Sequence, residues 1–150
     1  MAKFDPGHIL RSPKGNEYTI IRYLGEGVTA QVYLAGRTVV PEPDERFPYG
    51  SQVALKVLQD NLPEDIVQNF RDEAVTLREL FIWESKINQN IVPRLLETVT
   101  GSHLPQEFLV MEFVTGYPLD KFIQAKGPLP EQEGLLIASQ VLAVLDILHT

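Results

Sequence analysis

The chain contains no cysteine, and this absence excludes a disulfide framework and any thiolate chemistry. No apolar run is long enough to span a bilayer, because the longest one, residues 135–148, is interrupted by Ser139, Gln140 and Asp146. Residues 1–14 lack the apolar centre that a signal peptide requires. We therefore expect a cytoplasmic protein without a membrane segment.

A surplus of positive charge is also lacking, since 13 lysines and arginines face 20 aspartates and glutamates and the formal net charge is −7. The basic residues form no cluster, and an acidic surface repels phosphate backbones and anionic lipids. Nucleic acid and membrane surfaces are therefore not expected as partners. The 150 residues, of which 44% are hydrophobic, suffice for one ordinary domain with a core.

The order of the predicted elements indicates an α+β fold. Runs rich in β-branched and aromatic residues predict strands at 18–24, 30–37, 51–58, 95–99 and 107–113. Helical patterns cover residues 61–83, 119–125 and 131–149. This order is typical of a mainly antiparallel sheet with one helix, followed by the start of a helical region. We expect residues 1–17 to be a loose lead-in and residues 38–50 to be an exposed insertion.

A turn with two glycines joins the first two predicted strands. Gly25 and Gly27 are separated by one residue, and this spacing favours a tight turn with exposed backbone N–H groups that can approach a phosphate. A plain hairpin turn explains the glycines equally well. A dinucleotide-binding fold is disfavoured because a strand follows the glycines, and a Walker loop is disfavoured because no Gly-Lys-Ser/Thr follows them.

Two charged residues lie on apolar faces. Lys56 belongs to a strand that is otherwise nearly all apolar and shares a face with Ala54. Glu73 falls within the apolar stripe of the following helix, one turn from Phe70 and one from Leu77. Each charge alone could reach solvent, but opposite charges that both point inward favour an ion pair, because an unpaired buried charge is costly.

Five motifs in this order resemble the eukaryotic-type protein kinases, including their bacterial serine/threonine members. They are Gly25-x-Gly27-x-x-Ala30-x-Val32, Val53-Ala54-Leu55-Lys56, Glu73 in its helix, the strand and hinge Phe108–Gly116, and Leu148-His149. The resemblance covers about residues 18–149. It implies a kinase N-lobe at residues 18–114, with a five-stranded antiparallel sheet and one helix. Residues 115–150 would then be the hinge and the first two helices of the C-lobe.

The resemblance also implies a site for ATP. Backbone amides of Gly25, Glu26, Gly27 and Ala30 would cover the phosphates, and Lys56, oriented by Glu73, would hold two of them. Leu24, Val32 and Ala54 would pack on the adenine. Met111 would be the gatekeeper, and the main chain of Glu112 and Val114 would bind the adenine edge.

The resemblance further implies that the catalytic loop and the Asp-Phe-Gly motif follow His149. Residues 1–150 therefore offer no catalytic base and no dedicated metal ligand, and Mg²⁺ is expected only in a complete kinase that phosphorylates protein substrates. We expect the segment to be an inactive fragment of a serine/threonine kinase. A pseudokinase-like module that binds nucleotide or regulates a partner stays open, as does an unrelated α+β domain. Because the predicted helix 131–149 is apolar nearly all round, we also expect self-association.

Overall fold

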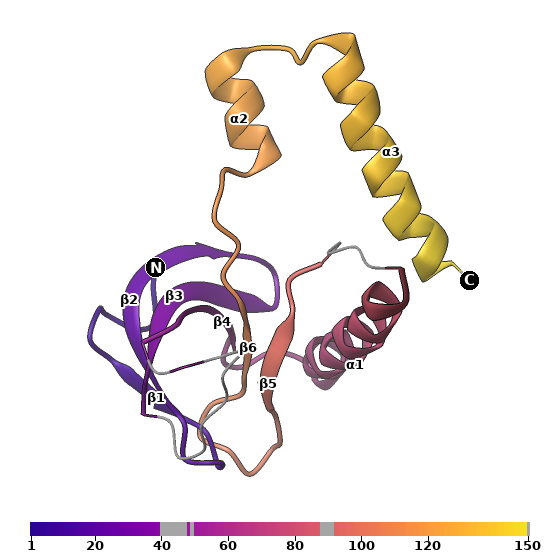
Figure 1. The fold of residues 1–150 in the computed structure, drawn as a ribbon. Coiled ribbons are helices and arrows are strands. Elements are labelled where there is room, and N and C mark those ends of the chain that lie inside the picture. The colour runs from indigo at the N-terminus through magenta and orange to yellow at the C-terminus, as the bar shows by residue number, and fades with distance from the viewer. Residues whose placement is uncertain (40–47, 49, 88–91, 150) are drawn as a thin grey trace. The chain divides into compact units, whose positions relative to one another are not determined.

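The computed structural model describes residues 1–39, 48, 50–87 and 92–149, apart from the side chains of 83–87, 147 and 148. The chain divides into two compact units, Met1–Phe113 and Val114–Thr150. The predicted insertion 38–50 falls mostly outside the described residues. The first unit holds a sheet and one long helix, and the second holds two helices (Figure 1).

The sheet of the first unit is antiparallel throughout. Its strands are β1 Ile9–Arg11, β2 Glu17–Glu26, β3 Ala30–Val39, β4 Gln52–Leu58, β5 Leu95–Val99 and β6 Phe108–Glu112. They lie side by side in the order β1-β2-β3-β4-β6-β5. The predicted α+β fold with an antiparallel sheet and one helix is confirmed, and strand β1 is an addition to the five predicted strands.

The N-terminal segment is more ordered than the sequence predicts. Ile9 pairs with Thr19, so the short strand β1 extends the sheet at the edge of β2. Phe4 packs against the core, and its ring lies 5.9 Å from the ring of Tyr33. The expectation of a loose lead-in is therefore wrong, because sparse apolar residues separated by turns gave no local signal for these long-range contacts.

Both faces of the sheet carry buried apolar side chains, because alternate side chains of β3, β4 and β6 are apolar in both directions. One face forms the larger core cluster of Leu10, Tyr18, Ile20, Tyr33, Ala35, Val53, Leu55, Val57, Val99, Phe108 and Val110. The other face forms a smaller cluster with the helix, made of Ala30, Leu58, Phe70, Ala74 and Leu109. The helix thus covers the face to which Leu109 belongs.

Helix α1, Glu64–Ile87, begins later than predicted. Asn61, the predicted N-cap, has a positive φ of 58° and lies in the turn before the helix. The carbonyl of Pro63 instead accepts the first helical hydrogen bonds, from the N–H groups of Ile66 and Val67, both at 3.0 Å. The acidic residues of the first turn, Glu64 and Asp65, suit the positive end of the helix dipole.

A buried polar network ties β2, β3 and β5 together. The hydroxyl of Tyr18 donates to the Glu97 carboxylate at 2.5 Å, and the Asn16 amide donates to the same oxygen at 3.0 Å. The Arg37 guanidinium donates to the Asn16 carbonyl oxygen at 2.8 Å. Burial and the nearby Glu97 carboxylate raise the pKa of Tyr18 above its usual value.

The second unit consists of helices α2, Leu119–Lys126, and α3, Glu131–Leu148. Each helix follows a proline, and Gly127 ends α2 with a φ of 87°. Several large apolar side chains of α3 are exposed, among them Leu135, Leu136, Val141 and Leu142. The predicted exposure of apolar side chains on α3 is therefore confirmed.

Among the described residues, no helix is long and apolar enough to cross a membrane.

Candidate functional site

The strand register brings the predicted site residues of three strands onto one face of the sheet. Lys56 in β4 lies opposite Val32 in β3, and Ala54 lies opposite Met111 in β6. Opposed residues of antiparallel strands point to the same side, and residues two apart on a strand do so as well. Val32, Ala54, Lys56 and Met111 therefore share the face that helix α1 covers in part.

Lys56 and Glu73 form the ion pair that the sequence predicts. The Lys56 ammonium nitrogen lies 2.6 Å from Oε1 and 2.5 Å from Oε2 of Glu73. Phe70 and Ala74 hold the helix against the sheet on either side of Glu73, since both are buried in the same cluster. The side chains keep part of their surface in solvent, 22% for Lys56 and 36% for Glu73. The cation is thus both oriented and accessible to an anionic ligand.

The glycine turn, which contains Gly25 and Gly27, lies where strand β2 leads into strand β3. Neither Gly25 nor Gly27 has a positive φ, and a Cβ atom built on either would meet nothing within 4 Å. The fold itself therefore does not require glycine at these two positions. What the glycines provide is open space beside the backbone, which is what the approach of a phosphate needs.

Contacts with β4 and its end hold the turn in place. The Gln59 side chain donates to the Gly27 carbonyl at 2.9 Å, and the Gln59 backbone N–H donates to the Thr29 carbonyl at 3.0 Å. The Gly27 N–H donates to the Ala30 carbonyl at 2.9 Å and closes the turn. That donor is therefore already used in this conformation, while Gln59 links the turn to the strand that carries Lys56.

Three comparisons with known proteins bear on this arrangement. Residues 18–150 match the family model described as protein tyrosine and serine/threonine kinase. The chain belongs to the protein kinase family. It is 30% identical over 137 residues to a probable serine/threonine-protein kinase PknB of Lactococcus lactis, and 30% identical over 134 residues to the serine/threonine-protein kinase PrkC of Bacillus subtilis. These alignments cover 90% and 88% of this chain but only 19% and 18% of the relatives.

Solved kinase structures share the fold. The structure of vaccinia related kinase 3 matches with a TM-score of 0.67 at 18% identity, over 99% of this chain and 43% of that one. Rad53 in complex with AMP-PNP matches with a TM-score of 0.57 at 27% identity, over 88% of this chain and 30% of that one. The chain thus corresponds to a part of each of these two kinase structures.

Other residues predicted for the site lie in different surroundings. The Glu26 carboxylate accepts a hydrogen bond from the Gln31 side chain at 2.9 Å, so it is held by a residue that also bonds Tyr33 in the core of the opposite face. Only the backbone of Glu26 is therefore suited to the predicted role. Ala30 is buried in the cluster beneath helix α1, and its small side chain serves packing there. Leu24 is half-buried on β2.

The predicted hinge begins at the end of β6. Met111 is half-buried and packs on the cluster beneath the helix. The Glu112 N–H donates to the Arg94 carbonyl at 2.8 Å, so this donor is engaged by the chain itself. Val114 is exposed and is the first residue of the second unit. The role of these residues toward a nucleotide stays a prediction.

A second ion pair attaches helix α1 to the sheet, and it was not predicted from the sequence. The Arg71 guanidinium donates to both oxygens of Glu107, at 2.6 Å and 3.0 Å, and also reaches Glu64 at 3.3 Å. The hydrogen bond from Arg71 is the main reason that the pKa of Glu107 is lowered, and the same bond raises the pKa of Arg71. No sequence signal separated Glu107 from the other acids at strand ends.

Among the residues that the structure describes, no three His, Cys, Asp or Glu side chains lie together as a metal site would require. On the face described above, Lys56 and Glu73 are the charged groups that pair with each other. This arrangement can hold and orient an anion, and it assigns no metal ligand to the described residues.

Proposed function

We propose that residues 18–114 bind ATP on the sheet face that carries Lys56. In the whole protein, this binding would serve transfer of the γ-phosphate to serine or threonine hydroxyls of proteins. Two of the similar proteins are named as serine/threonine kinases, and a similar structure contains AMP-PNP, an ATP analogue. The main support for this proposal is that Lys56, oriented by Glu73, shares a face with Ala54 and Val32 beside an open glycine turn.

Each group has a role that follows from its chemistry. The Lys56 ammonium has three donors, and Glu73 holds it while leaving part of it in solvent, so it can also bind the α- and β-phosphates. Backbone N–H groups of residues 25–30 other than that of Gly27, which is bonded to Ala30, are the further donors of this proposal, and the absent Cβ atoms of the glycines permit a close approach. Catalysis of phosphoryl transfer depends on this kind of positioning and charge stabilisation.

The adenine would lie over the apolar part of the same face. Val32 and Ala54 offer contact, and the small Ala54 leaves room for a planar ring. Met111 borders this region, because it is the cross-strand partner of Ala54. The Glu112 carbonyl and the Val114 N–H are the backbone groups proposed for the adenine edge, since the Glu112 N–H is already bonded within the sheet.

Transfer of the γ-phosphate needs a catalytic base and metal ligands, and this proposal assigns neither to residues 1–150. A kinase requires a base for the substrate hydroxyl and ligands for Mg²⁺, which neutralises charge on the transferring phosphate. The described residues include no cluster that could hold the metal. We therefore expect residues 1–150 alone to bind ATP without transferring phosphate. The cytoplasmic location expected from the sequence stays part of this proposal.

Titration with a fluorescent ATP analogue tests the nucleotide site. Lys56→Met should weaken binding about tenfold or more, because a hydrogen bond to a charged group contributes roughly 1.5–3 kcal/mol. Lys14→Met removes an exposed lysine of the same unit and serves as the matched control. Glu73→Gln should weaken binding less than Lys56→Met, since the cation remains while its orientation is lost. Equal affinity of the wild type and Lys56→Met would remove Lys56 from the site.

A second candidate function is that of a pseudokinase-like regulatory module, and the exposed apolar side chains of α3 favour it. These side chains give the chain a surface on which copies of itself or a partner can pack. The Lys56→Met variant, in which ATP binding is expected to be weakened, discriminates the two functions. A regulatory module should associate through α3 as strongly in this variant as in the wild type. Lys56 and Glu73 favour the kinase proposal, since pure association has no need for an oriented cation.

A further inference from the structure

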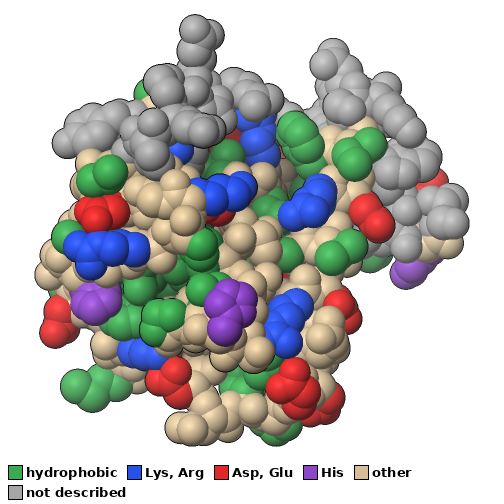
Figure 2. Space-filling view, turned by 90° about the horizontal axis from the view of Figure 1, so that it is seen from below, with side chains coloured by type: hydrophobic (Ala, Val, Ile, Leu, Met, Phe, Trp, Pro, Cys, Tyr) green, Lys and Arg blue, Asp and Glu red, His purple; other side chains and the backbone are tan. Residues whose placement is uncertain are grey.

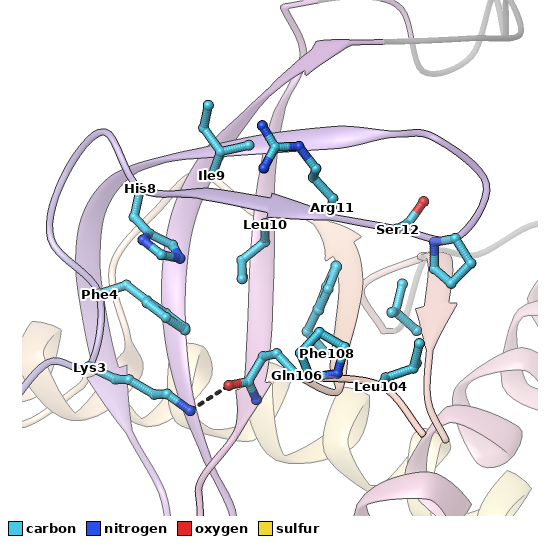
Figure 3. Close-up of a pocket in the computed structure, with 13 residues that line it drawn as sticks. Lys3, Phe4, His8, Ile9, Leu10, Arg11, Ser12, Leu104, Gln106 and Phe108 are labelled. Carbon is cyan, nitrogen blue, oxygen red and sulfur yellow. Dashed lines mark hydrogen bonds between the residues drawn. The ribbon is translucent and has the colours of Figure 1, made fainter. Parts of the chain in front are cut away.

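A cavity of about 570 Å³ opens beside strand β1, within the first unit and apart from the kinase site. It lies between the N-terminal segment, β1 and the loop before β6 (Figure 3). Its lining residues are Lys3, Phe4, His8, Ile9, Leu10, Arg11, Ser12, Pro13, Val99, Leu104, Pro105, Gln106 and Phe108. None of the residues proposed to bind ATP belongs to this lining. The volume falls in the range of small-molecule sites, roughly 300–1,000 Å³.

The inner wall of the cavity is apolar and rigid. Leu10, Val99 and Phe108 line it and are buried members of the main core, so their positions are set by the sheet. On the N-terminal side, the rings of Phe4 and His8 stack with their centroids 4.3 Å apart and an angle of 17° between their planes. An apolar group that entered the cavity would therefore meet preformed surfaces.

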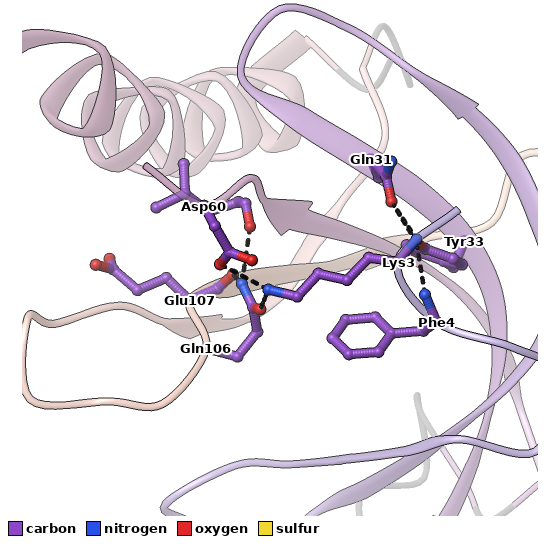
Figure 4. Close-up of polar contacts among 8 residues, drawn as sticks. Lys3, Phe4, Gln31, Tyr33, Asp60, Gln106 and Glu107 are labelled. Atoms are coloured by element: carbon purple, nitrogen blue, oxygen red, sulfur yellow. Dashed lines mark hydrogen bonds and ion pairs between the residues drawn. The ribbon is translucent and has the colours of Figure 1, made fainter. Parts of the chain in front are cut away.

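One end of the cavity carries a cation that the fold holds in place. The Lys3 backbone N–H donates to the Gln31 side chain and to the Tyr33 hydroxyl, both at 2.9 Å. The Lys3 ammonium donates to Asp60 at 2.7 Å and to Gln106 at 2.5 Å (Figure 4). The backbone contacts fix the position of Lys3, and its ammonium group lies at the edge of the cavity.

Gln106 is fixed in turn, because its amide nitrogen donates to the carbonyl of Leu58 at 2.8 Å and to that of Glu107 at 3.1 Å. Its oxygen is thereby directed toward Lys3. A lysine ammonium has three donors, and the contacts with Asp60 and Gln106 use two of them. Asp60 is 61% exposed, so this pair is solvated and contributes little to stability.

The lining contains basic side chains and no carboxylate. Figure 3 shows Arg11 directed away from the cavity, where its Nε donates to Glu17 at 2.6 Å, while Lys3 and His8 remain at the edge. Figure 2 shows acidic and basic side chains interspersed on one face of the described residues. Lys3 is therefore the cation at the cavity edge, and an anionic head group would share it with Asp60.

We propose that this cavity binds a small amphipathic carboxylic acid, such as a medium-chain or aromatic acid. The apolar part packs on Leu10, Leu104 and Phe108, and the carboxylate accepts a hydrogen bond from the Lys3 ammonium. The carboxylate competes with Asp60 for this cation. The site is separate from the proposed ATP site, because the two share no residue.

Isothermal titration with octanoate, octan-1-ol and octylamine tests the proposal on residues 1–150. Octanoate should bind the wild type more tightly than octan-1-ol, and octylamine should bind more weakly than either. Lys3→Gln should weaken octanoate binding about tenfold and leave octan-1-ol binding unchanged, since only the charged contact is lost. Lys126→Gln, which removes an exposed lysine of helix α2, should change neither affinity.

Two further variants keep the test decisive. Asp60→Asn removes the competing carboxylate and should tighten octanoate binding several-fold, a gain that a poorly folded protein cannot produce. Leu104→Trp fills the cavity and should abolish binding of octanoate and octan-1-ol while fluorescent ATP binding persists. The proposal is wrong if octanoate binding to the wild type does not saturate, or if octanoate binds Lys3→Gln with unchanged affinity. Either result leaves the ATP-binding proposal unaffected.

Discussion

Glu107→Gln tests whether the unpredicted ion pair with Arg71 fastens helix α1 to the sheet. The substitution keeps the size of the side chain and removes its charge. Only 9% of the Glu107 side chain is exposed, and both of its oxygens accept from the guanidinium. In the variant, one oxygen is replaced by an amide donor that faces another donor. A buried polar group then loses its partner, which is more costly than the loss of a solvated ion pair.

The expected loss in the free energy of unfolding is about 2 kcal/mol, from roughly 1.5–3 kcal/mol for a hydrogen bond to a charged group. Urea unfolding followed by circular dichroism measures it. With a slope of about 1–3 kcal/mol per molar, the midpoint should fall by about 1 M. The control is Glu64→Gln, because Glu64 contacts the same Arg71 at 3.3 Å but is 82% exposed. Its effect should stay below about 1 kcal/mol.

The pH dependence gives an independent signature. The pKa of Glu107 is lowered in the folded state, chiefly by its hydrogen bond to Arg71, so the unfolded state takes up a proton first as the pH falls. The contribution of Glu107 is fully present above its unfolded pKa of 4.5 and is lost as the pH falls through the lower folded value. The stability difference between wild type and Glu107→Gln should therefore shrink below about pH 4.5. A difference that is absent at pH 7, or that is independent of pH, would refute the reasoning.

Two further predictions concern apolar side chains. Phe70→Ala should destabilise the first unit by about 3–5 kcal/mol in urea unfolding, because Phe70 is 1% exposed and joins α1 to the sheet; a cost below about 1 kcal/mol would contradict the described packing. The chain should self-associate with rising concentration in sedimentation velocity, and Leu142→Glu on the exposed part of α3 should reduce this association. A wild type that sediments as a monomer at all concentrations would argue against association through α3.

Local sequence patterns predicted most of the sheet and the central ion pair. Strands β2 to β6 follow from β-branched runs and their turns, and α1 follows from a stripe of apolar residues at helical spacing. Lys56 and Glu73 stood out because each interrupts an apolar face with a charge. A charge on such a face requires a partner, and this requirement can be read without coordinates.

The sequence by itself therefore determined strands β2 to β6, the three helices and which two charges should meet, because side-chain alternation and helical spacing are properties of neighbouring residues. Only the tertiary structure decided the pairing of Arg71 with Glu107, the added strand β1 and the cavity beside it. Lys3 meets Gln106 across 103 positions of the chain, and Arg71 meets Glu107 across 36. Contacts of this range depend on how the sheet curls and where the helix docks, and no local pattern of residues encodes them.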